Sequence, residues 1–153
     1  MPLKHQKITI FGFGSQGRAQ ALNARDSGWE VEIFLRPGSP KISEANREKF
    51  SIVTDPVLAA RQTGIAVLLI PDMAQPEFWE TVLKPNLPKG ASLIFAHGFN
   101  IHFKYIGKRP DIDYLLVAPA LQGDALREHY VNREPVAILT AVEQNFSDQS
   151  YRL

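Results

Sequence analysis

The sequence predicts an α/β fold built on a doubly wound, mostly parallel sheet. Segments with the pattern of strands and of helices alternate along the 153 residues, a length that suits one domain. The run Ile65–Ile70 is almost wholly apolar and rich in branched residues, as in a strand covered on both faces, so we place it at the centre of the sheet. Three glycines, Gly12, Gly14 and Gly17, lie where the first strand gives way to the first helix.

The individual elements follow from local patterns. We expect strands at Lys7–Phe11, Glu30–Leu35, Ser51–Val53, Ile65–Ile70, Ala91–Phe95, Tyr114–Val117 and Pro135–Thr140. We expect helices at Gln16–Ser27, Ser43–Lys49, Pro56–Gln62, Pro76–Leu83 and Asp124–Val131. Asp55 followed by Pro56 is typical of a helix N-cap with proline in the first turn. The domain is predicted to span residues 1–143, and residues 144–153 to form a polar tail that is either loosely held or docked.

Composition excludes several classes of function. The formal net charge is +1 without a basic run, so we expect no nucleic-acid partner. Cysteine is absent, which rules out disulfides and thiolate chemistry. No apolar run approaches the roughly 20 residues that cross a bilayer, and the first strand begins within a few residues of Met1 without a signal-peptide pattern. We therefore expect a cytoplasmic protein without membrane contact.

The three glycines form the pattern G-x-G-x-x-G between a strand and a helix. Gly12 would permit the tight turn, Gly14 would let a pyrophosphate approach the backbone, and Gly17 would let the helix pack closely. The helix N-terminus would then face the phosphates. This predicts a Rossmann-type dinucleotide site, and a merely structural glycine turn is the alternative.

The loop after the second strand indicates which nicotinamide cofactor binds. Arg36, Ser39 and Lys41 offer a guanidinium fork, a hydroxyl and a point charge, and no carboxylate ends the strand. This composition favours the 2′-phosphate of NADP over NAD. The alternative is that these are solvated loop residues.

Several stretches together resemble the N-terminal NADP-binding domain of ketol-acid reductoisomerase, an enzyme of branched-chain amino-acid biosynthesis. They are "GFGSQGRAQALNARDSGWEV", "FLRPGS", "LLIPDMAQPEFW", "PNLPKGASLIFAHGFNIHF" and "VAPALQGDALREHYV", and they extend over residues 8–140. The resemblance implies an NADPH-dependent oxidoreductase that isomerises a 2-acetohydroxy acid by alkyl migration and reduces the product with the help of two magnesium ions.

The same resemblance assigns the cofactor-binding residues. The pyrophosphate is expected against Gly12, Gly14, Ser15, Gln16 and Gly17. The 2′-phosphate falls to Arg36 and Ser39, and the adenine and ribose side to Leu69, Ile70, Pro71, Asp72 and Gln75. The nicotinamide end is expected beside His97, Gly98, Asn100 and Pro119. His97 is the candidate catalytic residue, with a polar cap on the preceding strand as the alternative.

Two departures from the family bear on activity. Ala120 stands where the family has a lysine that projects into the active site, and the family's magnesium ligands lie in an all-helical C-terminal domain beyond this sequence. Three pairs of acids could offer ligands to a replacement metal site, but none has further acidic partners, so solvated faces are the expectation: Asp111 and Asp113, Asp124 and Glu128, and Glu77 and Glu80. We therefore expect no metal site in this chain and no complete activity without a helical domain that supplies magnesium.

Three functions follow as alternatives. The first is the NADP-binding domain of a ketol-acid reductoisomerase whose helical domain either belongs to a separate chain or lies outside this sequence. The second is a catalytically degenerate NADP-binding sensor or interaction module, and the third is a small reductase of another carbonyl or imine. A homodimer is expected in each case, for which Phe99, Ile101, Phe103 and Tyr105 are candidates, although these four side chains could equally belong to the core.

Overall fold

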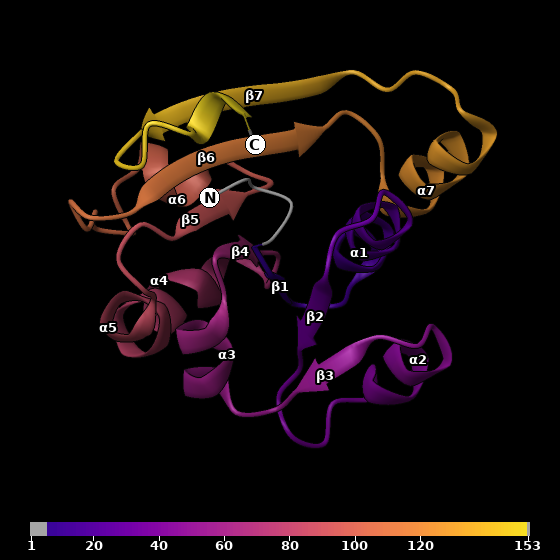
Figure 1. Ribbon diagram of the computed structural model, residues 1–153, viewed down its shortest axis with the longest axis horizontal. Helices are drawn as coiled ribbons and strands as arrows, with labels where there is room; N and C mark the ends of the chain where they lie inside the picture. The colour runs from indigo at the N-terminus through magenta and orange to yellow at the C-terminus, as the bar shows by residue number, and fades with distance from the viewer. Residues whose placement is uncertain (1–5, 153) are drawn as a thin grey trace.

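A single seven-stranded sheet organises the chain (Figure 1). The computed structural model describes residues 6–152. The strand order is β3-β2-β1-β4-β5-β6-β7, and all neighbours are parallel except β6 and β7. The strands are β1 Ile8–Phe11, β2 Val31–Phe34, β3 Ser51–Val53, β4 Ile65–Leu68, β5 Ser92–Phe95, β6 Asp113–Pro119 and β7 Ile138–Gln144. The predicted fold class is confirmed, and β4 is the central strand as expected.

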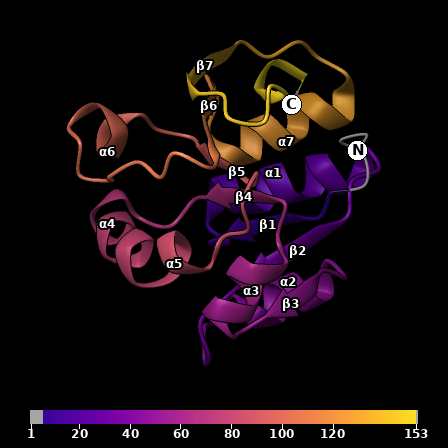
Figure 2. The same cartoon turned by 60° about the vertical axis from the view of Figure 1, so that its left-hand side comes forward.

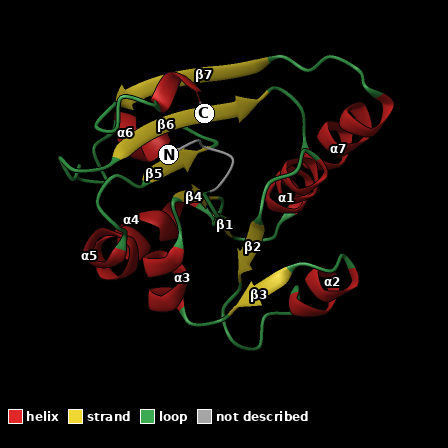
Figure 3. Cartoon of the chain, in the orientation of Figure 1, coloured by secondary structure: helices red, strands yellow, loops and turns green. Residues whose placement is uncertain are grey.

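Helices cover both faces of this sheet, as Figures 1 and 3 show. One face carries α1 Ser15–Asp26, α2 Ile42–Arg47 and α7 Gly123–Asn132. The other carries α3 Pro56–Gln62, α6 Phe99–His102 and one continuous helical segment formed by α4 Gln75–Phe78, a π-helical turn Trp79–Leu83 and α5 Lys84–Asn86. Among the described residues, no helix is long and apolar enough to span a bilayer.

Alternation along β1 divides the core into two layers. Ile8 and Ile10 pack with the α1 and α2 layer, whereas Phe11 packs with Trp79 and Leu83 in the opposite layer. Side chains of a strand point alternately to the two faces, so a strand covered by helices on both sides is apolar at successive positions. This is why β1 and β4 are buried at all four of their residues.

Local signals locate most elements within a few residues. Asp55 caps α3 as predicted, because its Oδ1 accepts hydrogen bonds from the backbone N–H groups of Val57 and Leu58 at 2.8 and 3.0 Å. The helix expected at Pro76–Leu83 runs on to Asn86 through the π-helical turn, and β4 ends two residues before Ile70. The short helix α6 was not predicted.

The end of the sheet differs from the sequence prediction. The last strand was expected at Pro135–Thr140, but β7 runs from Ile138 to Gln144 and lies antiparallel to β6. It is an edge strand that is exposed along most of its length, including the apolar side chains of Ile138 and Leu139.

The polar segment from Gln144 onward, which begins with the last residue of β7, is docked rather than loosely held. Gln144 Nε2 donates hydrogen bonds to the backbone oxygens of Arg109 and Ile112 at 2.7 and 2.6 Å. The carboxylate of Asp113 accepts hydrogen bonds from the Ser147 backbone N–H at 2.9 Å and from Ser92 Oγ at 3.2 Å. Asp113 is fully buried, so the expectation of a solvated acidic pair is wrong for this residue.

Candidate functional site

The glycine turn between β1 and α1 is built from backbone contacts that admit no side chain at two positions. Gly12 has φ +112°, and a Cβ there would lie 2.9 Å from the carbonyl carbon and oxygen of Leu69. A Cβ on Gly17 would lie 2.2 Å from the Gly12 carbonyl oxygen. Gly17 is therefore required for the close packing of α1 against the turn, as the sequence predicted.

Gly14 differs from the other two glycines because the space beside it is open. A Cβ built there meets no atom within 4 Å. Gly14 is the N-cap of α1, a helix of 12 residues that begins without a side-chain cap. The first backbone N–H groups of a helix lack partners within the helix, and its dipole favours anions at this end. The turn therefore offers an uncovered peptide surface suited to a pyrophosphate.

A cavity of about 590 Å³ opens beside this turn. Its size suits part of a dinucleotide, since sites for small ligands commonly enclose 300–1,000 Å³. Three segments line it: the turn and the end of β2 with Gly12, Phe13, Gly14, Phe34 and Leu35, the following loop with Arg36, Ser39 and Lys41, and the far wall with Ile70, Pro71, Ala74, Glu77, Phe78 and Thr81.

The loop after β2 presents cationic and hydroxyl groups to this cavity. Gly38 has φ +74°, and the Ser39 backbone N–H donates to the Arg36 carbonyl at 3.1 Å, which closes a turn. Arg36 is exposed and forms no ion pair with any residue that the structure describes. Its guanidinium is therefore available to a phosphate, for which a planar fork of donors is well suited.

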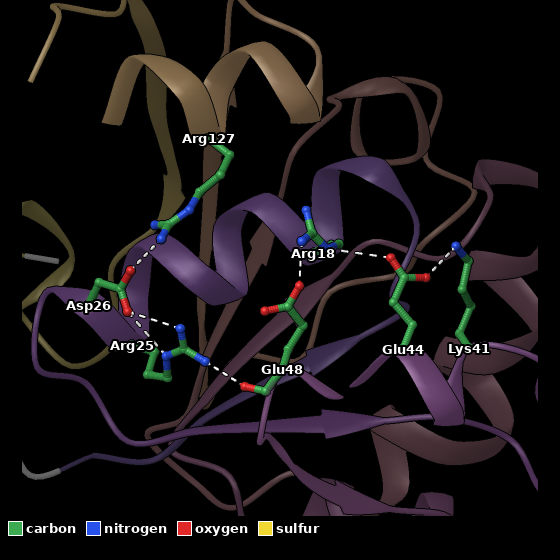
Figure 4. A network of polar contacts seen from close by, with 7 residues as sticks. All are labelled: Arg18, Arg25, Asp26, Lys41, Glu44, Glu48 and Arg127. Atoms are coloured by element: carbon green, nitrogen blue, oxygen red, sulfur yellow. Dashed lines mark hydrogen bonds and ion pairs between the residues drawn. The ribbon is translucent and has the colours of Figure 1, made fainter. Parts of the chain in front are cut away.

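A network of ion pairs attaches this loop to the helices behind it (Figure 4). Lys41 Nζ lies 2.7 Å from Glu44 Oε2, and Glu44 also faces Arg18 of α1 at 3.4 Å. Arg18 pairs with Glu48 as well, and Arg25 Nη1 donates to the Glu48 backbone oxygen at 2.6 Å. The hydrogen bond from Lys41, together with nearby arginines, lowers the pKa of Glu44. The loop is thus anchored to α1 through charged groups.

A second cluster of candidate residues lies at the carboxyl ends of β4 and β5. Asp72 Oδ2 lies 3.2 Å from His97 Nδ1, and Asp72 Oδ1 accepts a hydrogen bond from Gln75 Nε2 at 3.1 Å. Asn100 Nδ2 donates to the backbone oxygen of Asp72 and to Gln75 Oε1, both at 2.9 Å. The partner of the His97 side chain is thus the carboxylate of Asp72. Because this side chain is 67% exposed, its ring remains accessible to a ligand.

The structure brings only some of the predicted residues to the cavity. Gly12, Gly14, Arg36, Ser39 and Pro71 line it, together with Lys41 and Ile70. Asp72, Gln75 and His97 form the second cluster. The remaining predicted residues do not line the cavity, and their roles toward a cofactor stay predictions: Ser15, Gln16, Gly17, Gly98 and Pro119.

Two of these residues join α1 to α7, which lie side by side in Figures 1 and 2. Gln16 Nε2 donates to the Leu121 backbone oxygen at 2.7 Å, and a Cβ on Gly123 would lie 2.1 Å from the Ser15 carbonyl oxygen. Gly98 lines a smaller cavity of about 200 Å³ against β5, β6 and β7, and Pro119 lines a groove of about 350 Å³ with residues of α1 and α7. Neither residue borders the cavity beside the glycine turn.

Sequence reasoning missed the helical wall of the cavity. Ala74, Glu77, Phe78 and Thr81 line it at spacings of three and four residues, which places them on one helix face. The sequence predicted a helix at Pro76–Leu83, but it did not indicate which face of that helix lies opposite the Arg36 loop. Within residues 6–152, no cluster of three or more histidine, aspartate or glutamate side chains is arranged to hold a metal ion.

Comparisons with known proteins identify the family of the chain. A family model described as acetohydroxy acid isomeroreductase, NADPH-binding domain, matches residues 2–153. The ketol-acid reductoisomerase (NADP(+)) of Xanthomonas oryzae pv. oryzae is 44% identical over 144 residues, which are 94% of this chain and 43% of that protein. That of Pyrobaculum arsenaticum is 44% identical over 149 residues, 97% of this chain and 45% of that protein.

A solved structure supports the same relationship. An NADH-preferring ketol-acid reductoisomerase from an uncultured archean superposes with a TM-score of 0.91 at 36% identity, covering 97% of this chain and 46% of that one. The chain therefore spans less than half the length of each of these relatives.

Proposed function

The chain belongs to the acetohydroxy acid isomeroreductase family, also called ketol-acid reductoisomerases, as their NADPH-binding domain, and from this premise we propose that it provides the cofactor half of such an enzyme. One observation supports the proposal most strongly. The open peptide surface at Gly14 and the guanidinium of Arg36, which forms no ion pair within the described part of the chain, border the same cavity. A pyrophosphate and a 2′-phosphate need these two kinds of donor within one cofactor's reach.

Each part of the site has a role in this proposal. The N-terminus of α1 and Gly14 hold the pyrophosphate, and Arg36 and Ser39 bind the 2′-phosphate. The Asp72 and His97 pair, at the carboxyl ends of the central strands, borders the nicotinamide, where ligands of open α/β sheets bind. When bound, NADPH would supply a hydride, and these residues would hold and orient the cofactor.

The substrate chemistry is proposed to be completed outside this chain. The family resemblance implies a 2-acetohydroxy acid substrate and two magnesium ions. Because the described residues contain no group arranged to hold a metal, we assign the magnesium ligands to a helical domain in the part of the relatives that this chain does not span. We propose that a helical chain carrying those ligands can partner this domain, whereas the homodimer and the cytoplasmic location expected from the sequence stay predictions.

Side-by-side titration of the chain with NADPH and NADH tests the cofactor assignment. We expect saturable binding with tighter binding of NADPH. The second step is to mix the chain with a separately produced helical domain of a relative and to follow NADPH oxidation with acetolactate and magnesium. NADPH binding without turnover in any such mixture would contradict the catalytic half of the proposal and leave the cofactor assignment intact.

One observation favours a second candidate function, an NADP-binding sensor that has lost catalysis. Ala120 occupies the position of the family's active-site lysine; it is exposed, and its backbone N–H donates to the Ala137 oxygen at 2.9 Å. No ammonium group is available there. In the mixed assay, recovery of turnover by Ala120→Lys but not by the unchanged chain would favour the sensor.

A further inference from the structure

The helical wall of the cavity carries one charged group, Glu77, which has no assigned role. Glu77 is exposed on α4, and its carboxylate forms no hydrogen bond or ion pair with another residue of the described chain. Its neighbour Glu80 differs: Glu80 Oε2 lies 2.7 Å from Lys84 Nζ and does not line the cavity. Glu77 is therefore an acceptor that faces the site without a partner among residues 6–152.

The two walls of the cavity have opposite hydrogen-bonding character. The loop wall provides the donors Arg36, Ser39 and Lys41. The helical wall is apolar at Ile70, Ala74 and Phe78. The hydroxyl of Thr81, on the same wall, donates its hydrogen bond to the Glu77 backbone oxygen at 2.7 Å. The Glu77 carboxylate is thus the one anionic acceptor among the residues of this wall.

The backbone that carries Glu77 is held in place on both sides. Before it, Gln75 is buried and donates to the Ile70 carbonyl at 2.9 Å. After it, the Phe78 ring packs against Phe34 and Phe11 with centroid distances of 5.6 and 5.7 Å. The adjoining π-helical turn buries Trp79 completely. Glu77 consequently presents its carboxylate from a fixed point of the wall, which lowers the entropic cost of binding.

Adenine offers a matching group. Its ring nitrogens are acceptors, and its 6-amino group is its hydrogen-bond donor. An ionised carboxylate can only accept. If the 2′-phosphate binds the loop wall as proposed, the base attached to the same ribose would lie toward the apolar helical wall. We propose that Glu77 accepts a hydrogen bond from the 6-amino group of the cofactor's adenine and so selects adenine over a 6-oxo purine; this inference rests on the proposed function, which places the adenosine end of NADPH in this cavity.

The test compares NADPH with deamino-NADPH, which carries hypoxanthine and presents a carbonyl oxygen at position 6. Dissociation constants are measured by calorimetry for the unchanged chain, Glu77→Ala, Glu77→Gln and the control Glu80→Ala. A hydrogen bond to a charged group corresponds to roughly tenfold or more in affinity, so we expect about tenfold tighter binding of NADPH by the unchanged chain and by the control. Glu77→Ala should reduce this ratio to about one.

Glu77→Gln provides an independent readout, because its amide can accept from an amino group or donate to a carbonyl. We expect it to bind both cofactors with similar affinity, and circular dichroism should show the same fold for all variants. A preference that persists in Glu77→Ala, or equal binding of the two cofactors by the unchanged chain, would overturn the inference alone. Failure of the unchanged chain to bind NADPH would overturn the proposed function together with it.

Discussion

Replacing Arg36 by aspartate is expected to weaken NADPH binding by about two to three orders of magnitude. Arg36 borders the cavity, is exposed and has no ion-pair partner within residues 6–152, so its charge is free for the 2′-phosphate. Losing a charge-assisted hydrogen bond costs roughly 1.5–3 kcal/mol. The introduced carboxylate adds repulsion of about 1 kcal/mol, the value for two charges some 4 Å apart in water. Since 1.4 kcal/mol corresponds to a factor of ten, the sum predicts this loss.

The assay is calorimetric titration with NADPH and NADH at low and high salt. NADH lacks the 2′-phosphate, so its affinity should change far less, and the effect on NADPH should shrink as salt screens the exposed charges. Arg47→Asp is the matched control, because it makes the same charge change on α2 without touching the cavity. Equal losses for both cofactors, or an equal effect of the control, would refute the assignment of Arg36 to the phosphate.

Three further predictions concern the turn and two titrating groups. Gly14→Ala should leave the free energy of unfolding unchanged yet weaken NADPH binding, because its Cβ would enter the open space proposed for the pyrophosphate. Gly17→Ala should lower the free energy of unfolding by about 1–3 kcal/mol in denaturant titration, because its Cβ would clash with the Gly12 carbonyl oxygen. Equal stabilities of the two variants would contradict this. Burial raises the pKa of Tyr114 from 10.0 to about 12, so stability should fall as pH rises through that range, and Tyr114→Phe should remove this slope. Hydrogen bonds from Arg127 and then Arg25 lower the pKa of Asp26 below 3.8, so the stability that ionised Asp26 contributes should be lost as pH falls below that value. If Asp26→Asn leaves the pH dependence of the free energy of unfolding in acid unchanged, Asp26 makes no such contribution.

Local chemistry explains what the sequence could predict. The cap at Asp55 and the close approach of Gly17 to Gly12 involve residues a few positions apart, so their patterns carried the information. Asp113 could not be placed this way, since its partners Ser92 and Ser147 lie 21 and 34 residues away. Its burial depends on the docked segment after β7, which has no periodicity of its own.

The site shows the same division. Gly14 and Arg36 were found because they follow directly from the ends of β1 and β2. Glu77 was not, because its place at the cavity depends on how the segment with the π-helical turn packs on the sheet. The direction of β7 was missed because alternation of strands and helices does not specify how an exposed edge strand runs.

The contact between Gly17 and the Gly12 carbonyl has a consequence for how such a domain can change during evolution. It ties the glycine turn to the folding of the chain, so a substitution at Gly17 lowers stability whichever cofactor is used. Arg36 is exposed, so its substitution is not expected to destabilise the fold in the same way. Cofactor preference can therefore drift while the scaffold is conserved, in keeping with an NADH-preferring homologue that retains nearly the same backbone.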